Sequence, residues 1–285
     1  MSLAQNRFVH GNPATHSFKG RKMMNRLIAR GLVVCLCCLG LAGLAIAEPK
    51  IGVVVMHGKW GNPGQLGAFA GSMERSGYLT ENIEMPWSGR RAYDAGADGF
   101  VAEIDAAIQA LKAKGATKIV LIGHSLGAAG GLHYVTRKPV DGFIAIAPGH
   151  APEGERLAAM FAASVAKARA MVAKGEGDEK AGFDDFNTGN RTKQVKMTAK
   201  VYLDFFDPNG PMNFTANVSK ILPGTNFLWA APSGEEPGLK ALTTRAVSLM
   251  PAAVKFKKVE IEAEHMNAPE KSVEVALAWI RDLKM

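Results

Sequence analysis

Ser125 is the residue whose surroundings most clearly predict chemistry. It lies at the centre of Gly123-His124-Ser125-Leu126-Gly127, a G-x-S-x-G pattern. The apolar run 117–122 precedes the pattern and the small-residue run 128–135 follows it, which predicts a strand, a tight turn and a closely packed helix. Glycine on both sides lets the two backbones approach each other. The pattern therefore predicts a nucleophile elbow with Ser125 at its apex.

A serine hydroxyl is a weak nucleophile at neutral pH and needs an adjacent base. His265 follows the last predicted strand, so it should lie at the same sheet edge as Ser125. We therefore expect His265 to be the base. His150 follows another strand and could line the substrate pocket, but the favoured interpretation is an ordinary loop histidine.

The base in turn needs a carboxylate that orients it and stabilises the imidazolium. With a nucleophile elbow, the chain order is serine, acid, histidine, and the acid follows the strand before that of the histidine. Glu235 and Glu236 occupy this turn. We favour Glu236 because a proline follows it, and Asp207, which also precedes a proline, is the rival.

An acyl-transfer site also needs N–H donors for the developing oxyanion. Leu126, the residue after the nucleophile, supplies one backbone N–H. The loop that begins His57-Gly58-Lys59 after the first strand supplies the other. Gly58 lets this backbone come close, so the Lys59 amide is the expected second donor.

Predicted strands alternate with helices over most of the chain. Alternation of this kind implies an α/β fold with a mostly parallel sheet and helices on both faces. Buried strands are expected at 51–56, 117–122, 142–147 and 226–231, weaker strands at 79–85 and 258–263, and a helix over 100–111.

Residues 152–200 interrupt this alternation. Apolar residues at helical spacing give way to the polar run 174–180, and 200–206 resembles a strand. The segment is interpreted either as an insertion that forms a small lid over the site or as a surface helix with a mobile loop.

The first 47 residues differ from the rest. They carry six basic residues and no acidic one, then the uncharged run 31–47, which ends Ala45-Ile46-Ala47. This is typical of a secretory signal peptide, although an uncleaved anchor helix is the alternative. We expect residues 48–285 to form the mature domain, periplasmic or secreted, with no stable membrane insertion after cleavage.

Composition excludes several classes of site from the mature domain. All three cysteines, Cys35, Cys37 and Cys38, lie in the leader, so no thiol or disulfide remains. Removing the six basic leader residues from 34 leaves 28 against 26 acidic residues, a net charge of +2, which does not indicate nucleic acid as a partner. No metal-ligand cluster and no phosphate-binding glycine loop is present, so we expect no cofactor and no metal.

In these motifs the chain resembles the α/β-hydrolase superfamily, and in particular its small secreted bacterial members. The shared residues are His57-Gly58, Met85-Pro86-Trp87-Ser88, Gly123-His124-Ser125-Leu126-Gly127, Gly234-Glu235-Glu236-Pro237 and His265. The resemblance implies an eight-strand-type, mostly parallel sheet and a cofactor-free serine mechanism. It also implies that Ser125 attacks an ester or related acyl bond while His265 moves the proton. The usual acid is aspartate, whereas this turn offers glutamate.

These residues support a carboxylesterase-like serine hydrolase that acts on a small acyl substrate. Two alternatives remain open: a non-catalytic binding protein on the same fold, and an acyltransferase or amidase that uses the same acyl-enzyme. The sequence indicates neither the substrate nor the oligomeric state.

Overall fold

Six parallel strands form the main sheet, in the order β2-β1-β3-β4-β7-β8. This computed structural model describes residues 49–187 and 191–283, so the predicted leader lies outside the described residues. The α/β fold with a parallel sheet is confirmed, but the described main sheet has six strands rather than eight. The strands are β1 (Ile51–Met56), β2 (Leu79–Ile83), β3 (Lys118–His124), β4 (Gly142–Ile146), β7 (Asn226–Pro232) and β8 (Lys255–Ile261).

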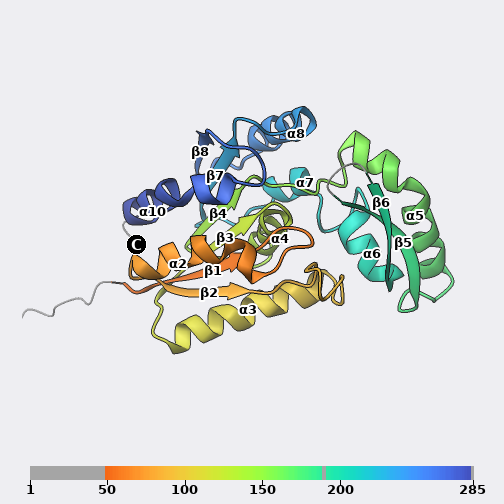
Figure 1. The fold of residues 1–285 in the computed structure, drawn as a ribbon, viewed down its shortest axis with the longest axis horizontal. Coiled ribbons are helices and arrows are strands. Elements are labelled where there is room, and N and C mark those ends of the chain that lie inside the picture. The colour runs from red at the N-terminus through yellow and green to blue at the C-terminus, as the bar shows by residue number, and fades with distance from the viewer. Residues whose placement is uncertain (1–48, 188–190, 284–285) are drawn as a thin grey trace, which may run out of the picture. The chain divides into compact units, whose positions relative to one another are not determined.

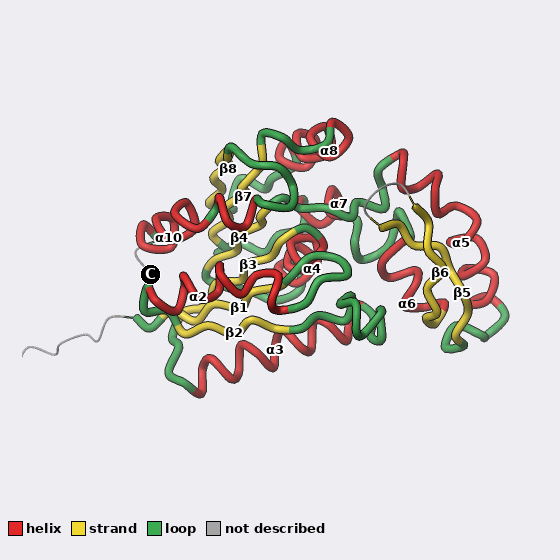
Figure 2. Tube along the Cα trace, in the orientation of Figure 1, coloured by secondary structure: helices red, strands yellow, loops and turns green. Residues whose placement is uncertain are grey.

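The two faces of the sheet are both buried, as the continuous apolar strands predict. Alternate residues point to opposite sides: Val53 and Val55 pack on one face and Val54 and Met56 on the other. Helices α2 and α10 cover the first face, and α3 and α4 cover the second (Figures 1 and 2). The helices around the sheet are η1 (Pro63–Leu66), α2 (Gly67–Arg75), α3 (Ala97–Ala113), α4 (Leu126–Val135), α7 (Phe214–Val218), α8 (Pro237–Ser248), α9 (Ala268–Lys271) and α10 (Val273–Asp282).

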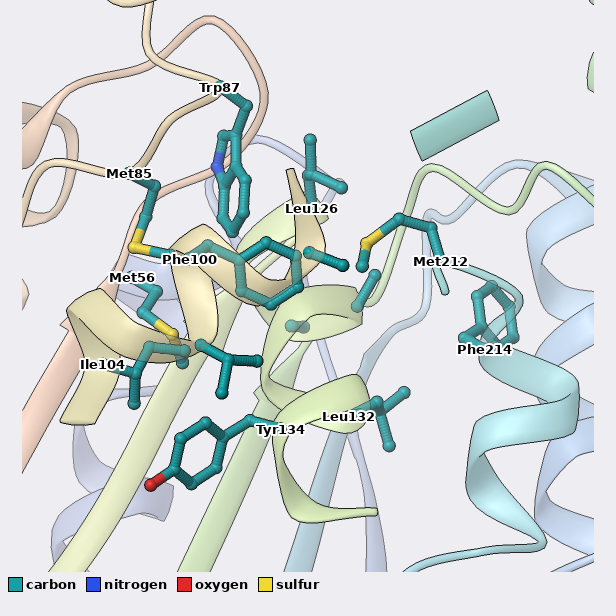
Figure 3. Close-up of a cluster of buried hydrophobic side chains, with 14 of the residues drawn as sticks. Met56, Met85, Trp87, Phe100, Ile104, Leu126, Leu132, Tyr134, Met212 and Phe214 are labelled. Atoms are coloured by element: carbon teal, nitrogen blue, oxygen red, sulfur yellow. The ribbon is translucent and has the colours of Figure 1, made fainter. Parts of the chain in front are cut away.

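Small residues in α4 let this helix pack tightly against its neighbours. A Cβ on Gly130 would lie 2.8 Å from the Trp87 ring, and one on Gly131 would lie 2.5 Å from the Phe143 ring. Figure 3 shows Trp87, Leu126 and Phe100 in this buried cluster. The helix after the elbow is thereby fixed against the sheet, and so is the turn at its N-terminus.

The segment between β4 and β7 forms a cap, which we define as residues 155–206. It comprises α5 (Glu155–Ala173), the antiparallel hairpin β5 (Lys180–Asn187) and β6 (Arg191–Thr198), and α6 (Ala199–Phe206). None of these elements joins the main sheet. They gather at the carboxyl ends of the parallel strands (Figure 1), where ligands bind in sheets of this kind.

The strand expected at 200–206 is wrong, because these residues form α6. Ala199, Tyr202, Phe205 and Phe206 are all buried, and their spacing is that of one helix face. The Thr198 hydroxyl caps the helix by accepting the Val201 N–H at 3.3 Å. The adjacent apolar and aromatic residues resemble a strand locally, and only their packing against α5 and β5 decides for a helix.

In the part of the chain that the structure describes, no helix is both long and apolar enough to cross a membrane.

Candidate active site

Ser125 lies on a strained turn between β3 and α4. Its backbone has φ 55° and ψ −117°, a conformation that non-glycine residues rarely adopt and that is found at functional sites. A Cβ on Gly123 would lie 2.3 Å from the Gly127 carbonyl oxygen, and one on Gly127 would lie 2.3 Å from the Met56 carbonyl oxygen. The predicted steric role of both glycines in the nucleophile elbow is confirmed.

His265 connects Ser125 to a carboxylate through two short hydrogen bonds. Its Nε2 lies 2.9 Å from Ser125 Oγ, and its Nδ1 lies 2.7 Å from Glu235 Oε2. The second Glu235 oxygen accepts the Glu236 backbone N–H at 3.0 Å. Both oxygens of the buried carboxylate are therefore engaged, which fixes the orientation of the imidazole ring.

The carboxylate that contacts His265 is Glu235 and not Glu236, which the sequence favoured. The Glu236 side chain is about half exposed, and it faces Arg156 of the cap at 3.4 Å. Asp207, the rival, pairs with Arg169 at 2.7 Å. Glu236 is the N-cap residue of α8, which begins with Pro237. The proline that drew attention to Glu236 marks a helix start.

The two predicted oxyanion donors lie at the same end of the sheet. Leu126 is the first residue of α4, so its N–H has no acceptor within the helix. Lys59 lies in the loop after β1, and Gly58 approaches Ser125 closely: a Cβ there would be 3.2 Å from Ser125 Cβ. Neither the Leu126 nor the Lys59 amide donates a hydrogen bond within the described residues. Both are thus available to a ligand.

The family comparison agrees with this arrangement. The sequence matches the family described as serine aminopeptidase, S33, over residues 47–195, which is more than half of the chain. The protein is an α/β-hydrolase of this family. No curated protein matches it significantly in sequence.

Solved structures of esterases and lipases share the fold of this α/β-hydrolase. One of the metagenome-derived lipolytic enzymes LipS and LipT has 17% identity and a TM-score of 0.57, covering 82% of this chain and 95% of its own. A monoacylglycerol lipase from Paleococcus ferrophilus has 16% identity and a TM-score of 0.59, over 81% and 94%. A carboxyl esterase from Bacillus coagulans has 13% identity and a TM-score of 0.60, over 84% and 92%. At these identities the likeness establishes the fold.

A cavity of about 890 Å³ opens at Ser125 and His265. Residues from the carboxyl end of the sheet, from the cap and from α8 line this cavity. Leucines on α5 and α8 give it an apolar side, and Glu153 and Arg156 give it polar groups. The lining also includes Lys59, Trp60, His150, Phe186 and Met266.

Four large aromatic residues near the sheet end divide into two groups. Trp60 lines the cavity of the α/β-hydrolase site. Trp87, Phe214 and Trp229 are fully buried and belong to the core. Trp87 still serves the site indirectly, because its Nε1 donates to the His57 carbonyl at 2.9 Å and so holds the end of β1.

Two buried histidines support the site without touching the reacting atoms. His124 Nε2 lies 2.9 Å from the His265 carbonyl oxygen, so it donates to the loop that carries the base. His150 Nε2 donates to the Phe205 carbonyl at 2.8 Å. Burial lowers the pKa of each histidine to about 4, so both rings are neutral at pH 7.

The polar groups of the cavity include one unusual carboxyl. Glu153 Oε1 accepts the Thr215 N–H at 2.9 Å, whereas its buried Oε2 has no partner among the described residues. Burial raises the pKa of Glu153. The residues described contain no cluster of three or more histidine, cysteine or acidic side chains able to hold a metal ion.

Sequence reasoning missed Gly149 and Asp185. A Cβ on Gly149 would lie 2.9 Å from Ser125 Oγ, so this position must stay small. The signal was available, because Gly149 follows the predicted strand at 142–147 and so reaches the same sheet edge. Asp185 carries no such signal, since its partner Lys59 lies 126 residues away in the chain.

Proposed function

We propose that this protein is a serine hydrolase that cleaves ester bonds of small acyl substrates through Ser125, His265 and Glu235. One observation carries the proposal: the unbroken line of hydrogen bonds from Ser125 Oγ through His265 to Glu235, at the mouth of a large cavity. The arrangement has the three roles of a serine triad, and each partner is within hydrogen-bond reach.

The proposed reaction follows from these positions. Ser125 Oγ attacks the acyl carbonyl carbon while His265 Nε2 takes its proton, and Glu235 stabilises the imidazolium that forms. The carbonyl oxygen becomes an oxyanion, which accepts hydrogen bonds from the Leu126 and Lys59 amides. His265 then protonates the leaving alcohol. Water, deprotonated by His265, attacks the acyl-enzyme and releases the acid and free Ser125.

A fluorophosphonate probe tests the nucleophile directly, because it reacts with activated serines. We expect the protein to be labelled once per chain, at Ser125, and Ser125→Ala to remain folded but unlabelled. Turnover of p-nitrophenyl acetate should disappear in the same variant. A folded wild-type protein that is neither labelled nor active would favour the alternative of a non-catalytic binding protein.

A second candidate is amide hydrolysis, which the description of the family as serine aminopeptidase suggests. Glu153 favours it, because a carboxyl side chain that lines the cavity is suited to pair with a substrate amine. Aminoacyl coumarin amides assayed beside esters of the same acyl groups would separate the two activities. Adding a short alcohol during ester turnover would reveal an acyltransferase as transesterified product.

We also propose that the protein acts outside the cytoplasm, in the periplasm or after secretion. The basic and then apolar leader that ends Ala45-Ile46-Ala47 supports this. Fractionation of cells that express the full chain, with N-terminal sequencing of the product, tests it. A mature N-terminus at Glu48 is expected, whereas an intact leader in the membrane fraction would favour the anchor.

A further inference from the structure

The side chain of Lys59 extends away from the reacting atoms and into the cap. Its Nζ donates to Asp185 Oδ1 at 2.9 Å and also to the Phe186 carbonyl. Both acceptors belong to β5 of the cap hairpin. The residue whose backbone N–H is the proposed oxyanion donor is therefore tied, by its side chain, to a segment that contributes nothing to the main sheet.

Asp185 is enclosed by donors. It is fully buried, and its Oδ2 accepts the Tyr93 hydroxyl at 3.0 Å while its Oδ1 also accepts the Phe186 N–H at 2.6 Å. A buried ion pair of this kind contributes little net stability, because the cost of removing both charges from water offsets their attraction. What it does supply is a defined geometry between the two segments that it joins.

The next residue, Trp60, shows that the loop backbone is held under strain. Its φ of 59° lies in the left-handed region, which is unfavourable for a non-glycine residue. Three contacts hold it: the Trp60 N–H donates to the Trp87 carbonyl at 2.9 Å, and the ring packs edge-on against Tyr93 and under Lys193 Nζ at 4.6 Å. Lys193 belongs to β6, so the same hairpin contacts two successive residues of the loop, Lys59 and Trp60.

We propose that Lys59 is a positioning residue. Its side chain, bound to Asp185 of the cap, orients its own backbone N–H towards the oxyanion. The inference rests on the proposed function, since it concerns the same acyl transfer. In consequence the oxyanion site is complete only while the cap hairpin is docked on the loop after β1. The cap then takes part in turnover as well as in enclosing the cavity.

The peptide group that carries the Lys59 N–H is also held on its carbonyl side. The Gly58 carbonyl accepts the Gly61 N–H at 3.1 Å and lies 2.8 Å from His57 Nδ1, and the Gly58 N–H donates to Gln65 Oε1 at 3.0 Å. These bonds keep the loop in place, and the Lys59 side chain adds the contact that joins it to the cap. Releasing the side chain should therefore shift the amide by a small distance while the loop as a whole stays in place.

The test compares Lys59→Met, Asp185→Asn and the double variant with wild type. Methionine keeps the backbone amide and most of the stem but removes the ammonium. For an ester substrate we expect kcat to fall about 10- to 100-fold in each single variant, since complete loss of one oxyanion donor costs about 10²- to 10³-fold. KM should change less than about threefold, because the interaction is made in the transition state. Arg169→Met, which breaks the ion pair between a half-exposed arginine of the cap and Asp207, is the matched control and should keep wild-type kcat.

The double variant separates positioning from folding. Each single variant leaves an unpaired buried group, so its melting temperature should fall, and removing both charges should largely restore it. Under the proposal kcat stays low in the restored double variant, and the affinity for a boronic acid transition-state analogue falls by the same factor as kcat. Recovery of kcat together with the melting temperature would overturn it.

The outcome also distinguishes this inference from the proposed function. If wild type shows neither labelling of Ser125 nor ester turnover, the proposed function fails and the inference fails with it. If wild type is active and Lys59→Met retains full kcat, only the positioning role is rejected.

Discussion

The carboxyl end of the sheet and the cap that covers it are built by different means. Ser125, Glu235 and His265 follow β3, β7 and β8, so the backbone of the parallel sheet places all three. The cap instead meets the loop after β1 through side chains, such as Asp185 with Lys59. Ser125, Glu235 and His265 are thus positioned by strand pairing, whereas the lining of the cavity depends on individual side-chain contacts that can change without altering the sheet.

Two adjacent glutamates lie on the boundary between these regions and give the largest predicted contrast. Glu235 contacts His265, whereas Glu236 faces the cap residue Arg156. We expect Glu235→Gln to lower kcat by about 10²- to 10⁴-fold, because the imidazolium loses its counter-charge. Glu236→Gln should stay within about threefold of wild type, because exposed ion pairs contribute little. Steady-state kinetics on one ester measures both, and equal losses would contradict the assignment.

A smaller effect is expected from crowding the sheet end without removing any reacting group. In Gly149→Ala the new methyl group would lie 2.9 Å from Ser125 Oγ and 3.1 Å from His265 Cε1. We expect kcat to fall about 10- to 100-fold, since displacing reacting groups by a fraction of an ångström is costly.

Gly67→Ala at the start of α2 is the control for this substitution, because nothing lies within 4 Å of its added Cβ. This variant should keep wild-type kcat. Unchanged turnover in Gly149→Ala, measured beside it, would show that the site has more room than the distances indicate.

The smallest effect concerns stability and pH. His124 lies at the sheet end and His150 bonds to the cap carbonyl of Phe205, and the pKa of each is about 4 in the folded state against 6.5 unfolded. Between these values the unfolded chain binds more protons, so the free energy of unfolding should fall as pH drops from 6.5 towards 4. The slope is up to about 1.4 kcal/mol per pH unit for each histidine.

Urea unfolding at pH 7, 5.5 and 4.5 measures this slope. His150→Asn, which suits the left-handed backbone at that position, removes one titrating group and should make the slope shallower. An identical slope in the variant would mean that His150 does not contribute, and that the cap contact is open to water before the sheet unfolds.

The residues placed by the parallel sheet could be predicted from the sequence, whereas the contacts of the cap could not. Ser125 and His265, which the structure places together, could be singled out because a strand, a turn and a residue type are local signals, and because parallel strands end at one edge. The structure places Glu235 rather than the favoured Glu236 against His265, and this depends on where one helix begins. The strand predicted at 200–206 was wrong because the burial of Phe205 and Phe206 is decided by elements far away in the sequence. Long-range contacts such as Lys59 with Asp185 leave no mark on neighbouring residues.

Ser125 and His265 are 140 residues apart in the chain, yet their side chains meet at 2.9 Å. That meeting requires β8 to be paired at one edge of the sheet and β3 to be in register near its centre. Covalent labelling of Ser125 is therefore a conformational assay as well as a chemical one. In a refolding mixture or a crude extract, the labelled fraction would measure the share of molecules in which β8 has joined the sheet. The total protein concentration does not report this share.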